Sequence, residues 1–380
     1  MLKKNKTFIS YSTGYVLNNL LSTFFLLYYS FLNQFELTAE IGLISSFTLF
    51  FLQSFSGNVR SLLFTNKNFL AKFFTVRLIT SLILLIVINI ILFIINIKNY
   101  FLLIFLSTIF IIQWVFELVL LHNELKKKVT IFNKYILVTV VFIFLFIFFD
   151  FFYPNQLFII FSIFLTYIIF QILKFLIGGE LLSYSFLDRS ELKFKFAPFF
   201  SSFSLTFANF LWRLLIIFFC GKTLAGIYFS AFAIGSLPGT IFNLTFKSNI
   251  GRYIINFKRI DKLIPIIFFL LLFFIFFFMF SLEFIFSHPH KIYLFSALIS
   301  ILGSYFMLRG LYFRQILLQR LKVYDKVFYI DSFYSSIIVL IVPLCFILGN
   351  IYLMSFLFFI SSLINFFIFK FSYIYYEKKI

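Results

Sequence analysis

Charged residues are scarce in this sequence. Asp, Glu, Lys and Arg make up 12% of the 380 residues, whereas 63% are hydrophobic and the mean hydropathy is +1.08. Soluble globular domains carry roughly twice that share of charge, so this chain cannot cover itself with a polar surface in water. Lipid must be its solvent, and only helices and closed barrels satisfy their backbone groups in lipid.

The sequence also lacks the alternating polar and apolar pattern of barrel strands. The run over 263–286 is apolar on every side and is far too long for such a strand. A spanning helix needs about twenty mostly apolar residues. We therefore predict an all-α integral membrane protein of about twelve transmembrane helices, near 8–32, 39–59, 77–97, 100–121, 130–149, 157–177, 197–220, 224–246, 263–286, 292–312, 327–348 and 351–374.

Motifs for metals, disulfides and nucleotides are missing. The two cysteines, Cys220 and Cys345, stand in or beside apolar runs without a CxxC spacing, which argues against a disulfide framework or metal site. His288 and His290 flank a proline in a turn with no third ligand nearby. No Gly-x-x-x-x-Gly-Lys-Ser/Thr loop is present, so the chain has no P-loop of its own. We expect no metal and no cofactor.

Long polar loops are absent too, and the longest connection lies near 178–195. The net charge of +19 therefore does not mark a nucleic-acid-binding domain. Of the 32 lysines and arginines, only Lys98, Lys222 and Lys291 fall in the alternate set of loops, and Arg213 lies within a span. This asymmetry predicts an inner-membrane protein with both termini in the cytoplasm.

The two halves of the chain contain a repeat. Matching polar positions at i, i+4, i+7 and i+11 occur in the first and seventh spans: Tyr11, Tyr15, Asn18 and Ser22, then Ser202, Thr206, Asn209 and Arg213. Such spacing places each set on one helical face. The repeat predicts two six-helix lobes, 1–195 and 196–380, related in parallel, with the two faces lining a substrate cleft at the repeat interface. The simpler interpretation is that these residues form interhelical hydrogen bonds.

Arg213 lies about eight residues, or ~12 Å, from the outer end of its span. A charge at this depth is costly and faces a partner or a wet cavity. We predict that it binds an anion such as phosphate; a structural pair with Glu117 or Asp331, or partial snorkelling, is the alternative. Arg60 could meet substrate from the inside or snorkel to the surface. Glu117 and Asp331 are candidates for proton or ion coupling, or are solvated or paired with nearby lysines.

Two segments, Asn209–Leu215 and Ala225–Ala231, resemble the polysaccharide-transporter branch of the multidrug/oligosaccharidyl-lipid/polysaccharide exporter superfamily. Arg213 and Gly226 match the arginine of helix seven and the Gly-x-Tyr opening of helix eight in that family. Trp212 stands where the family often has aspartate, so the resemblance does not extend to an acid–base pair there. The resemblance implies a non-enzymatic, O-antigen-type flippase for undecaprenyl-pyrophosphate-linked oligosaccharides that works by alternating access, with a polysaccharide polymerase and a chain-length regulator as partners.

Two other classes of function remain open. A small-solute carrier, or a drug/ion antiporter of the same superfamily, would share the helix count, although antiporters are expected to place carboxylates deep in the first lobe. A membrane-embedded polysaccharide polymerase or acyltransferase would need convergent polar groups at one face. Arg60 and His122-Asn123-Glu124 are the only hint of these groups, and such enzymes usually need a large extracytoplasmic loop.

Overall fold

The computed structural model describes residues 2–56, 69–95, 99–178, 196–247, 291–321, 323–348 and 351–378, with isolated positions at 265, 266, 269 and 273. Almost all of these described residues are helical, and no strand occurs among them. The elements are α1 (Leu2–Phe31), α2 (Phe35–Ser56), α4 (Phe69–Ile95), α5 (Tyr100–Leu125), α6 (Val129–Phe152), η1 (Pro154–Gln156), α7 (Leu157–Ile177), α8 (Phe196–Lys247), α11 (Lys291–Gln319), α12 (Tyr324–Ile347), α13 (Ile351–Ser355) and α14 (Leu357–Glu377).

The predicted all-α membrane architecture is confirmed. Each predicted span coincides with a helix, except that the one over 263–286 lies almost wholly outside the described residues. In the described part of the chain, 9 helices are long and apolar enough to cross a membrane, with α8 counted once. Helix α1 is not among them, because polar side chains interrupt its apolar character along much of its length.

Helix α8 consists of two helices that meet at Gly221, which has φ of 78° and ψ of 168°. Glycine adopts this positive φ without the steric cost that a Cβ atom brings. The Trp212 and Phe232 ring centroids lie 5.0 Å apart, and Arg213 lies over the Phe229 ring. Residues equally distant from Gly221 therefore face one another, so α8 is an antiparallel hairpin, as predicted for the spans 197–220 and 224–246.

The described helices group into two compact units. Unit 1 contains α1 up to Ser22, the end of α2 from Phe51, and α4, α5, α6 and α7, together with the last residues of α8. Unit 2 contains Thr23–Phe50, α8 up to Asn243, α11, α12, α13 and α14. The segment Thr23–Phe50 thus groups with the later helices rather than with the rest of 1–195. The two six-helix lobes of the predicted repeat stay a prediction.

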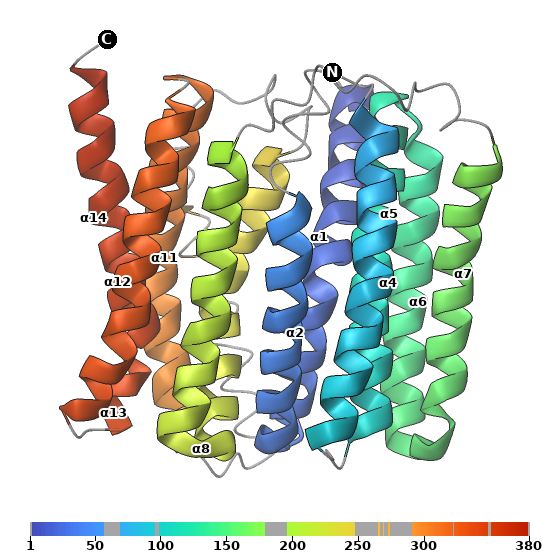
Figure 1. Ribbon diagram of the computed structural model, residues 1–380, viewed down its shortest axis with the longest axis horizontal. Coiled ribbons are helices and arrows are strands. Elements are labelled where there is room, and N and C mark those ends of the chain that lie inside the picture. The colour runs from blue at the N-terminus through green and yellow to red at the C-terminus, as the bar shows by residue number, and fades with distance from the viewer. Residues whose placement is uncertain are drawn as a thin grey trace. The chain divides into compact units, whose positions relative to one another are not determined.

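Helices α4 to α7 lie side by side in unit 1 (Figure 1). The interior is largely aromatic: the Phe142 and Phe164 rings stack at 4.1 Å, and Tyr11 meets Phe132 edge-on at 4.6 Å. Gly14 lets the Phe132 ring approach α1, since a Cβ there would lie 2.7 Å from that ring. Aromatic pairs of this kind stabilise a core beyond simple burial of their area.

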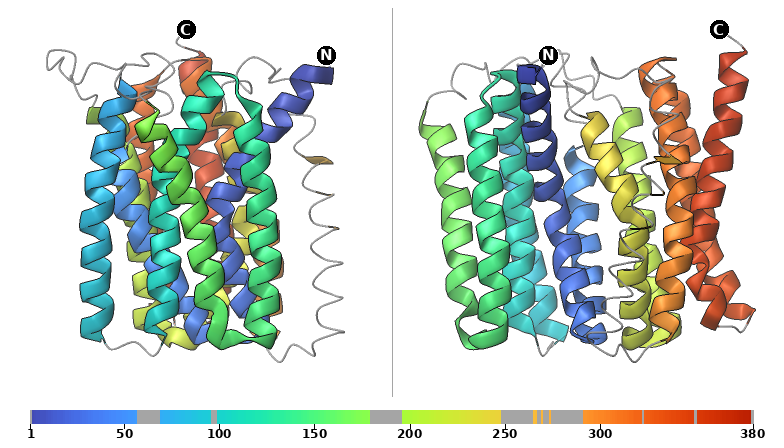
Figure 2. Two further views of the ribbon diagram at one scale, coloured as in Figure 1. Left: turned by 90° about the vertical axis from the view of Figure 1, so that its right-hand side faces the viewer. Right: turned by 180° about the vertical axis from the view of Figure 1, so that it is seen from behind.

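In unit 2, α11 packs along α14, and α12 lies beside them (Figure 2). Small residues allow this approach: a Cβ on Gly303 would lie 3.0 Å from the Phe359 Cα, and one on Gly310 would overlap the Asn365 side chain. Small residues are the usual means of close helix packing in membranes, where burial from lipid gives little driving force.

Two helix boundaries differ from the prediction in ways that matter for the site. Helix α4 begins at Phe69 rather than near 77, so Arg77 lies inside the helix and is 4% exposed. Helix α11 continues to Gln319 rather than ending near 312, so Arg314 is a helical residue and not a loop cation. The last predicted span is interrupted at Phe356, between α13 and α14.

Candidate functional site

Arg213 lies on the first half of the α8 hairpin and reaches α2 within unit 2. Its Nη1 donates to the Gly42 carbonyl oxygen and to the Ser45 hydroxyl, the latter at 3.0 Å, and its guanidinium carbon lies 5.4 Å from the Phe229 ring centroid. None of these partners is charged. Within the described part of the chain, no carboxylate neutralises Arg213, and neither Nε nor Nη2 makes a hydrogen bond.

Of the other predicted residues on this face of α8, the one nearest to Arg213 is the most exposed. Ser202 and Thr206 are half-buried, and the Thr206 hydroxyl donates to the Ser202 carbonyl at 2.7 Å. Asn209 is exposed, and its amide has no hydrogen bond to a described residue. An amide exposed in the middle of a span favours contact with water or a polar ligand over hydrocarbon.

The corresponding face of α1 lies in the interior of unit 1. Tyr11 and Tyr15 are 0% exposed, Asn18 is 8% exposed, and Ser22 is half-buried. The Tyr15 hydroxyl donates to Glu124 at 2.8 Å, whereas the Tyr11 hydroxyl has no partner in the described residues. In this conformation these side chains are buried rather than open to solvent, and their role in substrate binding stays a prediction.

Asn18 belongs to a buried hydrogen-bond chain that joins three helices. The Tyr135 hydroxyl donates to Asn18 Oδ1 at 2.9 Å and accepts from Gln113 Nε2 at 2.9 Å, and Asn18 Nδ2 donates to the Gln113 carbonyl at 3.4 Å. Sequence reasoning missed Gln113 and Tyr135, and noticed Glu124 only as part of a weak enzymatic hint. The signal for Gln113 and Glu124 was spacing: with Glu117 they lie on one face of α5 at i, i+4 and i+11.

Each of the two candidate coupling carboxylates has an arginine partner. Glu117 lies 3.2 Å from Arg77 Nη1, and Arg77 also donates to the Trp114 carbonyl and lies over that indole ring. Asp331 accepts from Arg314 Nε at 3.0 Å and from Nη2 at 2.8 Å. These contacts therefore differ from the two predicted alternatives, which were a pair with Arg213 and a pair with a nearby lysine. A role in ion coupling stays a prediction.

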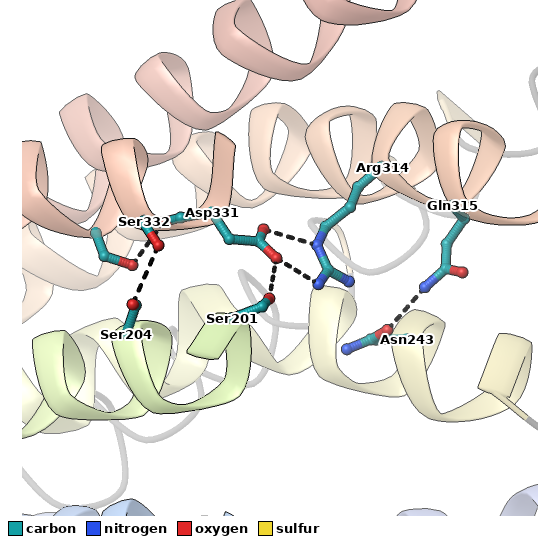
Figure 3. Close-up of polar contacts among 8 residues, drawn as sticks. Ser201, Ser204, Asn243, Arg314, Gln315, Asp331 and Ser332 are labelled. Carbon is teal, nitrogen blue, oxygen red and sulfur yellow. Dashed lines mark hydrogen bonds and ion pairs between the residues drawn. The ribbon is translucent and has the colours of Figure 1, made fainter. Parts of the chain in front are cut away.

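Asp331 is the centre of a polar cluster formed by α8, α11 and α12 (Figure 3). Ser201 donates to its Oδ2, and Ser204 lies 3.1 Å from the Ser332 hydroxyl. Farther along, Gln315 Nε2 donates to Asn243 Oδ1 at 3.1 Å. The Asp331 residue is 1% exposed, so Arg314 must compensate its charge, and Ser201 adds a hydrogen bond.

The two units repeat one pattern of contact. In unit 1 the first predicted span hydrogen-bonds to the fifth through Asn18 and Tyr135. In unit 2 the seventh hydrogen-bonds to the eleventh through Ser201 and Asp331. The first and fifth helices of each predicted half are therefore paired by polar groups.

Two further polar contacts join the start of α2 to the turn of α8. Lys222 Nζ lies 2.8 Å from Glu40 Oε1, and the Thr223 hydroxyl lies 3.4 Å from Glu36 Oε1. The Lys222 side chain is 51% exposed, so solvent screens this pair.

Arg60 lies outside the described residues, as do His288 and His290. Within the described ranges, no group of three His, Cys, Asp or Glu side chains is arranged to hold a metal ion. Cys220 and Cys345 are free thiols.

Comparisons with known proteins bear on the fold. No protein-family model matches the sequence, and no curated protein matches it. Among solved structures, the chain is similar to one described as "Crystal structure of MATE in complex with MaD5", with a TM-score of 0.56 and 13% sequence identity. The match covers 98% of this chain and 95% of that chain. The chain therefore has a MATE-like fold.

Proposed function

We propose that this chain is a membrane transporter that flips an undecaprenyl-pyrophosphate-linked oligosaccharide, such as an O-antigen repeat unit, across the inner membrane by alternating access. The observation that carries the proposal is Arg213, a cation deep in a span that no described carboxylate neutralises. The MATE-like fold supports a carrier of the superfamily that the sequence resembles.

The chemistry of Arg213 suits a pyrophosphate. Hydrogen bonds to the Gly42 carbonyl and to Ser45 solvate the guanidinium but do not cancel its charge. A phosphate oxygen would do both, and charge-assisted bonds to arginine are roughly twice as strong as neutral ones. The planar guanidinium can present its two nitrogens without a described partner as a bidentate fork.

The rest of the cargo fits the same face and its surroundings. The exposed amide of Asn209 and the hydroxyls of Ser202 and Thr206 offer polar contacts for sugar hydroxyls. Large apolar side chains exposed elsewhere on the helices, such as Phe93 at 77%, suit contact with lipid and with a polyprenyl tail. Glu117 and Asp331 remain candidates for ion coupling. We further propose that both termini lie in the cytoplasm. A polysaccharide polymerase and a chain-length regulator are the proposed partners.

The test is genetic. The gene is deleted in its native host, and lipid-linked sugar intermediates and surface polysaccharide are measured with complementation by the wild type, Arg213→Ala, Arg213→Lys or Arg320→Ala. Arg320, whose side chain is 60% exposed, is the matched control. We expect intermediates to build up on the cytoplasmic face in the deletion, rescue by the wild type and Arg320→Ala, and at least a tenfold loss of rescue with Arg213→Ala.

Unchanged surface glycan and intermediates in the deletion would overturn the flippase proposal. The alternative, a small-solute or drug/ion antiporter with the same fold, would then be tested by uptake into proteoliposomes. Glycan polymerisation or acylation by the purified chain in detergent would instead support a membrane-embedded enzyme.

A further inference from the structure

We propose that Arg213 is a switch: without cargo it holds α2 against α8, and on binding the anionic group of the cargo it releases α2. This inference rests on the proposed function in that the cargo carries an accessible anion. It adds a link between cargo binding and the movement of one helix.

The first step of the argument is how α2 is held. Its apolar contacts with α8, such as Phe47 with Phe210 and Phe50 with Phe207, have ring centroids 5.5 Å and 5.2 Å apart. In a membrane the hydrophobic effect adds little to such contacts, because lipid tails are equally apolar, so van der Waals packing and hydrogen bonds provide the attraction. The polar contacts of α2 therefore carry part of its attachment.

The second step compares those polar contacts. The Lys222–Glu40 pair is half-exposed and screened by water. The Thr223–Glu36 contact, at 3.4 Å, is long for a hydrogen bond between oxygens. Arg213 lies deeper and is partly buried, and it donates to two α2 acceptors. Of these three polar contacts between α2 and α8, it is the one least open to screening by water.

The third step is that the loss of Arg213 leaves no hydrogen-bond acceptor on α2 without a donor. The Gly42 carbonyl also accepts from the Ser45 hydroxyl at 3.0 Å, and a carbonyl inside a helix accepts from the N–H four residues on. Ser45 in turn keeps its bond to Gly42. Both acceptors on α2 therefore stay hydrogen-bonded when Arg213 leaves.

The fourth step is that Arg213 itself leaves only for a better partner. A buried guanidinium without any acceptor is costly, so in the absence of an anion the α2 carbonyl and hydroxyl keep it. A phosphate-type anion offers charge compensation that neither group provides. An anion at Nε and Nη2, which have no described partner, compensates the guanidinium charge and so weakens the charge-assisted bonds from Nη1 to α2. Because a ligand shifts an equilibrium by its differential affinity for the two states, an anion that binds Arg213 more tightly when α2 is released favours release.

The position of α2 on α8 is also defined by the backbone. The segment Thr23–Phe50, which carries both acceptors, belongs to the same compact unit as α8 up to Asn243. Gly226 admits the Phe35 backbone so closely that a Cβ there would overlap its carbonyl oxygen. This contact is steric rather than electrostatic, and it defines the position on α8 to which α2 can return.

The experiment uses the full chain in nanodiscs, with Cys220→Ser and Cys345→Ser to remove the native thiols. Cysteines at the two exposed positions Glu36→Cys and Thr223→Cys report by disulfide formation whether α2 is seated on α8. The probes are inorganic pyrophosphate and, separately, nanodiscs that contain undecaprenyl pyrophosphate. We expect the rate of disulfide formation to fall at least threefold with either probe.

The variants separate the switch from simple loss of structure. Arg213→Ala should form the disulfide at least threefold more slowly than the parent without any probe, and should no longer respond to one. Arg213→Lys, which keeps the charge, should form it at an intermediate rate and still respond. Lys222→Gln, which removes only the exposed pair, should change the rate less than twofold. Each variant must elute as a single species of the parent's size.

The proposal is overturned if Arg213→Ala forms the disulfide as fast as the parent, if Lys222→Gln slows it as much as Arg213→Ala, or if bound pyrophosphate leaves the parent's rate unchanged. Its failure is distinguishable from that of the flippase proposal. If the gene deletion leaves surface glycan intact while pyrophosphate and Arg213→Ala still slow disulfide formation, the switch holds for another anionic cargo.

Discussion

Replacing Asp331 by alanine should leave the charge of Arg314 without a partner inside unit 2. Asp331 is 1% exposed, accepts two hydrogen bonds from Arg314 at 3.0 Å and 2.8 Å, and accepts a third from Ser201. Breaking a buried ion pair by removing one partner typically costs about 3–5 kcal/mol, because the other charge stays buried. Since the Arg314 side chain is 13% exposed and water can reach part of it, we expect about 3 kcal/mol.

The same reasoning predicts that removing both partners costs much less. Buried ion pairs replaced by apolar residues of similar volume are often neutral in stability or better. The double variant Asp331→Leu with Arg314→Met should therefore lie within about 1 kcal/mol of the parent. The double-mutant cycle built from Asp331→Leu and Arg314→Met should give a coupling energy of at least about 2 kcal/mol, since the two side chains are in direct contact.

The free energies of unfolding are measured by SDS titration in mixed micelles, with near-ultraviolet circular dichroism as the signal. Arg320→Ala is the control, because Arg320 is 60% exposed and lies 3.9 Å from the carboxylate of Glu377. A surface pair of this kind contributes about 0–1 kcal/mol. If Asp331→Ala lost no more stability than this control, or if the coupling energy were below about 0.5 kcal/mol, the argument would be refuted.

Two further variants test packing and the buried network. Gly226→Val should destabilise unit 2 by more than about 2 kcal/mol, since the new Cβ would collide with the Phe35 carbonyl and overpacking of this kind is costly; normal SDS unfolding of this variant would contradict the close approach. Tyr135→Phe should cost about 1–3 kcal/mol, because Asn18 loses its donor and Gln113 its acceptor in a buried place; the same titration checks this value, and no change would mean that water replaces the hydroxyl.

Much of the fold follows from hydropathy alone, since lipid requires long apolar helices. The sequence predicted the α8 turn as well, and Gly221 provides the positive φ that the hairpin needs. The hydropathy pattern misplaced the ends of two helices, because each helix continues past a charged residue. The predicted spans placed Arg77 at the start of a helix and Arg314 beyond the end of one, whereas both lie inside helices in the structure. Only the folded structure shows that Glu117 and Asp331 compensate them.

The site was predictable in part. The depth of Arg213 in its span identified it, but its contact with Gly42 and Ser45 depends on how closely α2 approaches α8. That approach is set by glycines at Gly42 and Gly226, whose neighbours are Phe229 and Phe35. A hydropathy profile does not record such close approaches, and for this reason the grouping of Thr23–Phe50 with unit 2 was not anticipated.

The turn at Gly221 has a mechanical consequence. One non-helical residue separates the two halves of α8, and the ring contact between Trp212 and Phe232 lies about halfway along the hairpin. Because one residue joins the two halves and their side chains pack against each other, we expect a displacement of one half to move the other. A displacement of Arg213 would then be transmitted to Gly226 on the other side of the turn.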